Sequence, residues 1–260
     1  MLKITEEKNI AVISLDRPDV RNAFHPEMIQ RLTDEFQILS QRNDLRAIVL
    51  SGEGKAFCAG ADLNWMKSMV QYSLEQNRAD SEKLYEMFES LWNCPIPIIG
   101  VVHGAAFGGA LGLIAACDYV IAAENTQMCF SEVKIGLVPA VISAFILKKC
   151  SVGSIAPLMM SGQIFSPKKA LDAGLVHEVV SESHLAESLA RTVQNFQEAG
   201  PEAVRETKKL IRQFSDLDSS QLKAETCRVI SERRTSSEGQ EGLKSFLEKR
   251  VANWKAVHGS

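Results

Sequence analysis

One carboxylate in the middle of the chain could carry proton-transfer chemistry. Glu132 stands between the apolar run at residues 128–130 and Val133. A carboxyl group held against apolar surroundings has its pKa raised toward the range that is useful for proton transfer near neutral pH. A solvent-facing glutamate at the end of a strand is the commoner arrangement and is the alternative interpretation. Glu132 is therefore a candidate general acid or base.

The segment at residues 55–67 could present a backbone N–H group to a ligand. Ala59, Gly60 and Ala61 form a loop of small residues that permits close approach, and Asp62 can cap the helix that follows. An exposed N–H group at the start of a helix is a potential anion site. An ordinary strand-to-helix loop with an N-cap is the alternative, and this fragment alone favours it.

A second loop, at residues 103–112, could supply another such group. Gly108 and Gly109 open an apolar helix, and main-chain N–H groups in this position can stabilise a developing enolate or tetrahedral oxyanion. The glycines do not satisfy G-x-G-x-x-G and no Gly-Lys-Ser/Thr follows, so neither a dinucleotide site nor a P-loop is predicted. Close packing of a helix on a sheet is the alternative, and on this loop alone it is the more probable one.

Strands alternating with helices must position these loops. The pattern predicts an opening β-hairpin and then an α/β fold on a largely parallel sheet. Strands are expected at residues 2–5, 10–16, 46–52, 96–102, 119–123 and 175–180, and helices at residues 25–42, about 73–92 and 108–116.

The C-terminal part of the chain has a different character. After residue 180 the sequence reads as amphipathic helix, with breaks at Gly200-Pro201 and around residues 215–220. We therefore expect a core at residues 1–198 and a helical region at residues 199–260 whose apolar faces pack on the core or on another subunit.

The composition is that of an ordinary globular protein. The 260 residues are 45% apolar, and 29 Lys and Arg against 32 Asp and Glu give a net charge of -3. No concentrated positive charge is present, so nucleic acid is not expected as a partner. The six cysteines include no C-x-x-C pair, which predicts neither a zinc site nor a disulfide framework. The scattered cysteines indicate a reducing compartment, so we expect a cytoplasmic protein. Residues 95–117 are uncharged and long enough to span a membrane, but their two prolines and five glycines suit a buried strand, turn and helix better, so no membrane span is expected.

Three segments together indicate a family. AFCAGADL, HGAAFGGALGL and SEVKIGLVP, in this order and spacing, resemble the enoyl-CoA hydratase/isomerase (crotonase) superfamily, and the likeness extends from residue 15 to residue 250. It implies a crotonase-like core of repeated ββα units, a C-terminal helical trimerisation region, a homotrimer or a homohexamer made of two trimers, and an acyl-CoA thioester as substrate. CoA is then part of the substrate, and no metal or other cofactor is expected.

The resemblance also implies roles for particular residues. The oxyanion hole for the thioester carbonyl falls on the N–H groups of Ala61 and Gly109, beside Glu132. The residues implied along the CoA arm or at the thioester are Arg21, Asn22, Ala23, Ala59, Asp62, Leu63, Gly108, Ser131, Phe246 and Lys249, the last two often reaching CoA from a neighbouring subunit. Those implied around the acyl group are Trp65, Met66, Met69, Phe107 and Val141, with residues 64–69 forming a variable helix or, alternatively, an amphipathic surface helix.

One departure from the family pattern bears on the reaction. Hydratases with two catalytic glutamates carry one of them three residues after the oxyanion glycine, and that position is Gly112 here. A single carboxylate suits a Δ3,Δ2-enoyl-CoA isomerase. The segments AGADLNWMK, GAAFGGALGL and SEVKIGLVPAVIS nevertheless resemble methylglutaconyl-CoA hydratases and their carboxygeranoyl relatives, which favours addition of water to a branched enoyl-CoA. A non-catalytic or RNA-binding member of the fold is the outside alternative, although the basic doublets of the chain are dispersed among acidic residues.

Overall fold

A six-stranded sheet forms the centre of the computed structural model, which describes residues 1–214 and 217–256. The strand order is β1-β2-β3-β4-β6-β8, with β1 antiparallel to β2 and the other neighbours parallel. The strands are β1 (Leu2–Glu7), β2 (Ile10–Leu15), β3 (Ala47–Gly52), β4 (Ile98–Val102), β6 (Tyr119–Ala123) and β8 (Glu178–Val180). The expected hairpin and the crotonase-like α/β class are confirmed.

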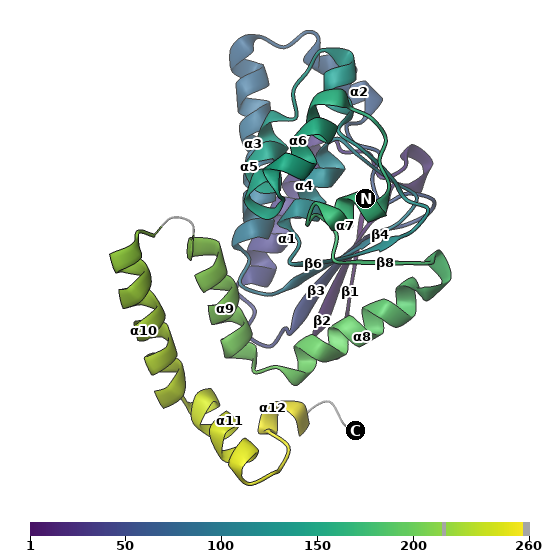
Figure 1. Ribbon diagram of the computed structural model, residues 1–260. Coiled ribbons are helices and arrows are strands. Elements are labelled where there is room, and N and C mark those ends of the chain that lie inside the picture. The colour runs from purple at the N-terminus through teal and green to yellow at the C-terminus, as the bar shows by residue number, and fades with distance from the viewer. Residues whose placement is uncertain (215–216, 257–260) are drawn as a thin grey trace.

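Helices cover both faces of this sheet (Figure 1). Alternate strand residues divide between two apolar clusters, as the two-residue period of a strand requires. Ile13 and Ile48 face the larger cluster, which the helices α1 (Pro26–Ser40), α3 (Leu74–Asn93) and α4 (Gly109–Ala116) complete. Ala47 and Val49 face the second cluster, which α8 (Leu185–Glu198) covers.

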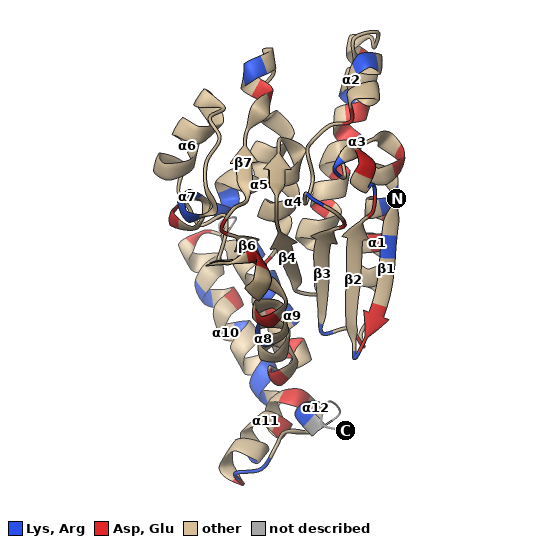
Figure 2. Cartoon of the chain, turned by 90° about the vertical axis from the view of Figure 1, so that its right-hand side faces the viewer, with Lys and Arg blue, Asp and Glu red and all other residues tan. Residues whose placement is uncertain are grey.

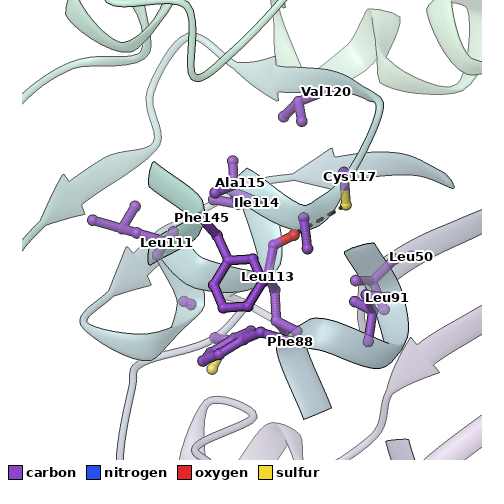
Figure 3. Packing of buried hydrophobic residues seen from close by; sticks show 14 of the residues in the cluster. Leu50, Phe88, Leu91, Leu111, Leu113, Ile114, Ala115, Cys117, Val120 and Phe145 are labelled. Carbon is purple, nitrogen blue, oxygen red and sulfur yellow. Dashed lines mark hydrogen bonds between the residues drawn. The ribbon is translucent and has the colours of Figure 1, made fainter. Parts of the chain in front are cut away.

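Helix α4 runs through the middle of the larger cluster. Figure 3 shows its side chains beside Phe88 of α3 and Phe145 of α5 (Ala140–Lys149). All its residues except Gly109 are buried. At its C-terminal end, Lys149 Nζ donates to the carbonyls of Ile114 and Cys117, 3.1 and 2.7 Å away. A cation there stabilises the helix dipole, whose positive end is left at Gly109.

A second, two-stranded sheet was not predicted. Its strands β5 (Ala105–Phe107) and β7 (Gln127–Cys129) run parallel. Each has only three residues, which is too few to produce a recognisable alternation in the sequence. Residue 131 begins the 3-10 helix η2 (Ser131–Ile135), so Glu132 does not lie at a strand end.

The remaining helices are α2 (Leu63–Met69), α6 (Val152–Ser161), α7 (Pro167–Asp172), α9 (Pro201–Gln213), α10 (Ser219–Thr235), α11 (Ser237–Leu247) and α12 (Asn253–Ala256), with short 3-10 helices η1 (Pro18–Val20) and η3 (Glu182–His184). Of these, α2, α6 and α7 each add at least one buried side chain to the larger cluster. The expected helical C-terminal region is confirmed, with α9 starting at Pro201; residues 215 and 216, in the second expected break, lie outside the described residues. Acidic and basic side chains are interspersed along α10 (Figure 2). Of the helices in the described residues, none is both long and apolar enough to span a membrane.

A charge cluster ties α9 to the sheet. Asp118, just before β6, accepts hydrogen bonds from Lys208 Nζ at 2.6 Å and Arg212 Nη2 at 2.8 Å. It also accepts from the backbone N–H of Ile98 at 2.8 Å. The three charged side chains are 8 to 19% exposed, so solvent screens their attraction only partly.

Removing the shared acceptor should therefore destabilise the protein. We expect Asp118→Ala to lower the free energy of unfolding by about 3 kcal/mol, because two cations stay behind without their partner. Urea unfolding at fixed protein concentration measures this. Glu82→Ala, which removes the exposed Arg78–Glu82 pair, is the control and should cause little measurable change. Equal effects of the two substitutions would contradict this role of Asp118.

Candidate active site

The first candidate oxyanion donor, Ala61, lies on a backbone held by Phe24. The N–H of Phe24 donates to Gly60 O, and the N–H of Asp62 donates to Phe24 O, both at 2.7 Å. In this parallel bridge the groups on either side of Ala61 face Phe24, so the N–H of Ala61 points the other way. Gly60 has φ +93°, a conformation that a residue with a side chain rarely adopts.

The second donor, Gly109, begins α4. Gly108 before it has φ +54° and ψ −122°, which turns the chain from β5 into the helix. A Cβ atom on Gly109 would lie only 3.0 Å from Cε2 of Phe24. Phe24 therefore supports both donors, one through its backbone and the other through its ring.

Backbone pairing brings three distant segments to one place. Cys58 pairs with Ala106, since Cys58 N–H donates to Ala105 O and Phe107 N–H donates to Cys58 O, each at 3.1 Å. On the other side of β5, Gly108 N–H donates to Cys129 O at 2.9 Å. The loop that follows β3, the start of α4 and the residues before Glu132 thus lie side by side.

Both candidate amides are free of partners in the chain. Within residues 1–214 and 217–256, no acceptor is found for the N–H of Ala61 or of Gly109. Ala61 is exposed and Gly109 is half-buried, so both N–H groups are accessible to a ligand, and two such donors in adjacent loops form a candidate binding site for an acceptor. A thioester oxygen is an acceptor of the required kind.

Glu132 lies beside this pair. Its Oε1 is 3.4 Å from the point that a Cβ on Gly108 would occupy, next to Ser131 Oγ at 3.5 Å. Its Oε2 is buried and has no hydrogen-bond partner among the described residues. Burial raises the pKa of the carboxyl group, and a hydrogen bond from its own backbone N–H opposes that rise only in part. An unpaired carboxyl with a raised pKa is suited to exchanging a proton with a substrate.

The position of the absent second glutamate is filled by apolar side chains. A Cβ on Gly112 would lie 2.6 Å from Ile142 Cγ2 and 2.7 Å from Phe88 Cζ. Real Cβ atoms do not approach so closely, so α4 packs here at a distance that only glycine permits. Position 112 therefore cannot supply a second carboxylate unless Phe88 and Ile142 move.

The residues implied along the CoA arm are divided between exposed and buried positions. Arg21 and Leu63 are exposed, whereas Ala23 and Asp62 are buried. The carboxylate of Asp62 caps α2 by accepting from Asn64 N–H and also accepts from Arg17, so its oxygens are already engaged. The roles of Arg21, Ala23, Ala59, Asp62, Leu63, Gly108 and Ser131 in CoA binding stay predictions.

The residues implied around the acyl group come from three elements. Trp65, Met66 and Met69 belong to α2, Phe107 to β5 and Val141 to α5. Trp65 is 6% exposed and its Nε1 donates to Asp80 of α3 at 3.3 Å, so α2 is fastened to α3 and is not a free surface helix. The contribution of these five residues to an acyl pocket stays a prediction.

Two of the implied residues are not brought to the site within one chain. Phe246 is 81% exposed on α11, and Lys249 follows that helix with φ +53°. Helices α2 and α11 lie at opposite ends of the molecule (Figure 1). The contact of Phe246 and Lys249 with the CoA of a neighbouring subunit, which the family resemblance implies, stays a prediction.

Reasoning from the sequence missed Phe24 and Arg17, and it placed Asn22 along the CoA arm, whereas the amide of Asn22 holds backbone segments together. Phe24 carries both donors, and Asn22 is fully buried with its amide bonded to Glu53 O and Ala56 O at 2.9 and 2.8 Å. Arg17 joins the loop before α1 to Asp62. The run RPDVRNAF contains all three residues, but only tertiary contacts distinguish a buried amide from a surface one. No group of three or more potential metal ligands occurs in the part of the chain that the structure describes.

Comparison with known proteins now identifies the family. The family described as enoyl-CoA hydratase/isomerase matches residues 5–257. The chain belongs to this family. An enoyl-CoA hydratase crystal structure from Shewanella pealeana superposes with a TM-score of 0.93 at 35% identity, covering 97% of this chain and 95% of that one.

Curated relatives agree with this assignment. Enoyl-CoA hydratase AKT6-1 of Alternaria alternata is 30% identical over 250 residues, covering 94% of this chain and 80% of the relative. The 2,3-dehydroadipyl-CoA hydratase of Escherichia coli is 25% identical over 255 residues, 98% of each chain. An enzyme of the enoyl-CoA hydratase/isomerase family acting on an acyl-CoA is thereby established, while the nearer likeness to methylglutaconyl-CoA hydratases stays a prediction.

The filled space at Gly112 leads to a prediction for this family member. We expect Gly112→Glu to destabilise the protein by about 3 kcal/mol or more, because the carboxylate would enter the contact between Phe88 and Ile142. Urea unfolding measures this, and Gly153→Glu is the control, since nothing lies within 4 Å of a Cβ there. A stable Gly112→Glu variant with raised hydratase activity would show that the position accepts a second catalytic carboxylate.

The raised pKa of Glu132 predicts a pH-dependent cost in stability. Because the folded protein holds this proton more tightly than the unfolded chain does, stability falls as the pH rises from the ordinary glutamate value of 4.5 through the higher folded pKa. Glu132→Gln lacks that loss, so its melting temperature should exceed that of the wild type at pH 7. The difference should shrink as the pH approaches 4. The exposed Glu89→Gln should show no such trend.

Proposed function

We propose that this protein adds water across the α,β double bond of an enoyl-CoA, with Glu132 as its only carboxyl acid and base. The observation that carries the proposal is the unpaired Oε2 of Glu132 beside the free amides of Ala61 and Gly109. Two hydrogen-bond donors and one proton-exchanging group are the minimum needed to form a thioester enolate and to protonate its α carbon.

Glu132 and the N–H groups of Ala61 and Gly109 suffice for the complete reaction. Ionised Glu132 takes a proton from water while the water oxygen forms a bond to the β carbon. The π electrons of the double bond move toward the thioester, and the N–H groups of Ala61 and Gly109 donate to the enolate oxygen that results. Glu132 then gives its proton to the α carbon, where the enolate electron pair forms the C–H bond. One water molecule has been added and the carboxylate is ionised again.

The names of the relatives support hydration and leave the acyl group to be tested. The relatives compared above are named as hydratases, and one of them is named for a dehydroadipyl substrate. We propose a branched enoyl-CoA, such as 3-methylglutaconyl-CoA, on the resemblance of the three motifs to the enzymes of leucine breakdown. Trp65, Met66, Met69, Phe107 and Val141 would enclose that acyl group.

Isomerisation between 3-enoyl-CoA and 2-enoyl-CoA is the second candidate. It is favoured by the packing of Phe88 and Ile142 against Gly112, which leaves no room for a carboxylate at that position. In that reaction Glu132 removes a proton from the α carbon and returns it to the γ carbon, and no water is bound covalently.

Assembly belongs to the same proposal. Phe214, Leu243, Phe246 and Leu247 on the C-terminal helices are each more than half exposed. Apolar surface of this kind is typical of an interface between subunits. We propose a homotrimer or a homohexamer in the cytoplasm, in which Phe246 and Lys249 reach the CoA of a neighbouring subunit, with the helical region at residues 199–260 as the assembly region.

Turnover of paired substrates tests the reaction. We expect a trans-2-enoyl-CoA to lose its conjugated thioester absorbance and to gain the mass of one water. Glu132→Gln should lower kcat by about 100- to 10,000-fold, since it can no longer exchange a proton. Straight and branched acyl groups are compared in the same assay.

A matched variant and a second substrate complete the test. Glu89→Gln, which changes an exposed glutamate, should retain full activity. Conversion of a 3-enoyl-CoA into its conjugated isomer without gain of water would replace hydration by isomerisation. Lack of turnover and of proton exchange with every acyl-CoA tried would exclude both reactions and favour a non-catalytic member of the fold.

A further inference from the structure

Arg17 links the two backbone segments that carry Phe24 and Ala61. Its Nη1 donates to the carbonyl of Ala23 at 2.7 Å, and its Nη2 donates to Oδ2 of Asp62 at 2.9 Å. One guanidinium group thus bonds the residue before Phe24 and the residue after Ala61. Its planar fork fixes both contacts in a single orientation, which an amine on a flexible chain does less well.

Asp62 passes this restraint on to the loop formed by Ala59, Gly60 and Ala61, here called the oxyanion loop. Its other oxygen, Oδ1, accepts from the N–H of Asn64 at 2.8 Å and so caps α2. The ion pair is well shielded from water, with 22% of the Arg17 side chain and 10% of the Asp62 side chain exposed. Ala61 is therefore held between the Phe24 bridge and a carboxylate that is bonded on both oxygens.

A buried amide fastens Arg17 itself. The N–H of Arg17 donates to Oδ1 of Asn22 at 2.8 Å. Asn22 has φ +57°, in the left-handed region that asparagine tolerates, and its Nδ2 bonds the chain just before the oxyanion loop. Arg17, Asn22 and Asp62, together called the clamp, thus hold the backbone before and after the oxyanion loop.

The charge of Asp62 is maintained by this clamp. Burial would raise the pKa of Asp62, but the hydrogen bonds from Asn64 N–H and from Arg17 outweigh it and hold the pKa below its ordinary value. The pair is therefore charged throughout the neutral range.

We propose that Arg17 is a positioning residue of the reaction, which through Asp62 aims the N–H of Ala61 at the thioester oxygen. The inference rests on the proposed function, because it takes Ala61 as an oxyanion donor. Neither Arg17 nor its ion pair needs to touch the substrate. Its effect should appear where charge develops on the oxygen and not in the affinity for CoA, because a small displacement of a donor weakens the transition state more than the ground state.

Three variants separate charge from capping. Arg17→Gln removes the ion pair, and Arg17→Lys keeps the charge without the fork. Asp62→Asn keeps a side chain that can cap α2 but removes the negative charge. The control is Arg42→Gln, which removes a surface guanidinium that bonds Glu6 at 3.0 Å and Asp44 at 2.6 Å, in a region distant in sequence from the oxyanion loop.

We expect a kcat effect with little change in KM. Arg17→Gln and Asp62→Asn should each lower kcat by about 10- to 100-fold, Arg17→Lys should lie between them and the wild type, and Arg42→Gln should match the wild type. KM should change by less than about threefold in all of them. Circular dichroism and thermal unfolding show which variants are folded. If Arg17→Gln does not fold, the kcat of Asp62→Asn still tests the proposal.

A spectroscopic measurement reports the donor geometry directly. The measurement uses a Glu132→Gln background, in which we expect turnover to be slow. The absorption of cinnamoyl-CoA moves to longer wavelength when its thioester carbonyl is polarised. The shift should be present with Arg17 and reduced when Arg17→Gln is added. An unchanged shift and an unchanged kcat in the folded Arg17 and Asp62 variants would overturn the positioning role. Absence of any shift with Arg17 in place would instead overturn Ala61 as a donor, and with it the proposed function.

Discussion

The site depends on backbone pairing between loops that lie beyond the main sheet. Cys58 pairs with Ala106, β5 pairs with β7, and Phe24 pairs with the residues on either side of Ala61. Each of these contacts joins segments that are far apart in the sequence. Because hydrogen bonds fix the direction of every peptide group they involve, the unbonded N–H groups of Ala61 and Gly109 are fixed as well. Preorganised donors need no reorganisation when charge develops on a substrate oxygen.

The buried helix α4 supplies the second constraint. Its apolar side chains lie among those of α3 and α5 (Figure 3). Lys149 occupies its C-terminal end. Such a helix presents the positive end of its dipole at Gly109 without solvent screening along its length. The same close packing leaves no room beside Gly112, so the support for the oxyanion hole and the absence of a second glutamate have one physical cause. A catalytic carboxylate at Gly112 would require a different core around Phe88 and Ile142.

At Glu132, suitability for chemistry conflicts with stability. Its Oε2 lacks a partner in the described chain, and burial raises its pKa. An isolated buried carboxyl reduces stability at neutral pH, which is typical of groups kept for chemistry and not for folding. Its position on the 3-10 helix η2, directly after β7, brings it to the oxyanion amides. With a single carboxyl group, the direction in which the proton moves depends on whether water or a γ carbon lies beside it, and the same scaffold supports both reactions.

The sequence alone determined the chain order of the six main-sheet strands and of helices α1, α3 and α4, the cap at Asp62, the glycine start of α4 and the three motifs of the family. These features are local, because they depend on hydrophobic period, turn residues and short spacings that can be read along the chain. The sequence also singled out Ala61, Gly109 and Glu132, although each had a structural alternative until their loops were seen together. Only the tertiary structure decided that β5 and β7 pair, that Phe24 supports both donors, that Gly112 is enclosed by Phe88 and Ile142, and that Arg17 reaches Asp62. Those contacts join residues separated by tens of positions, and the direction of a side chain or of a peptide N–H group follows from its packing and not from its neighbours in sequence.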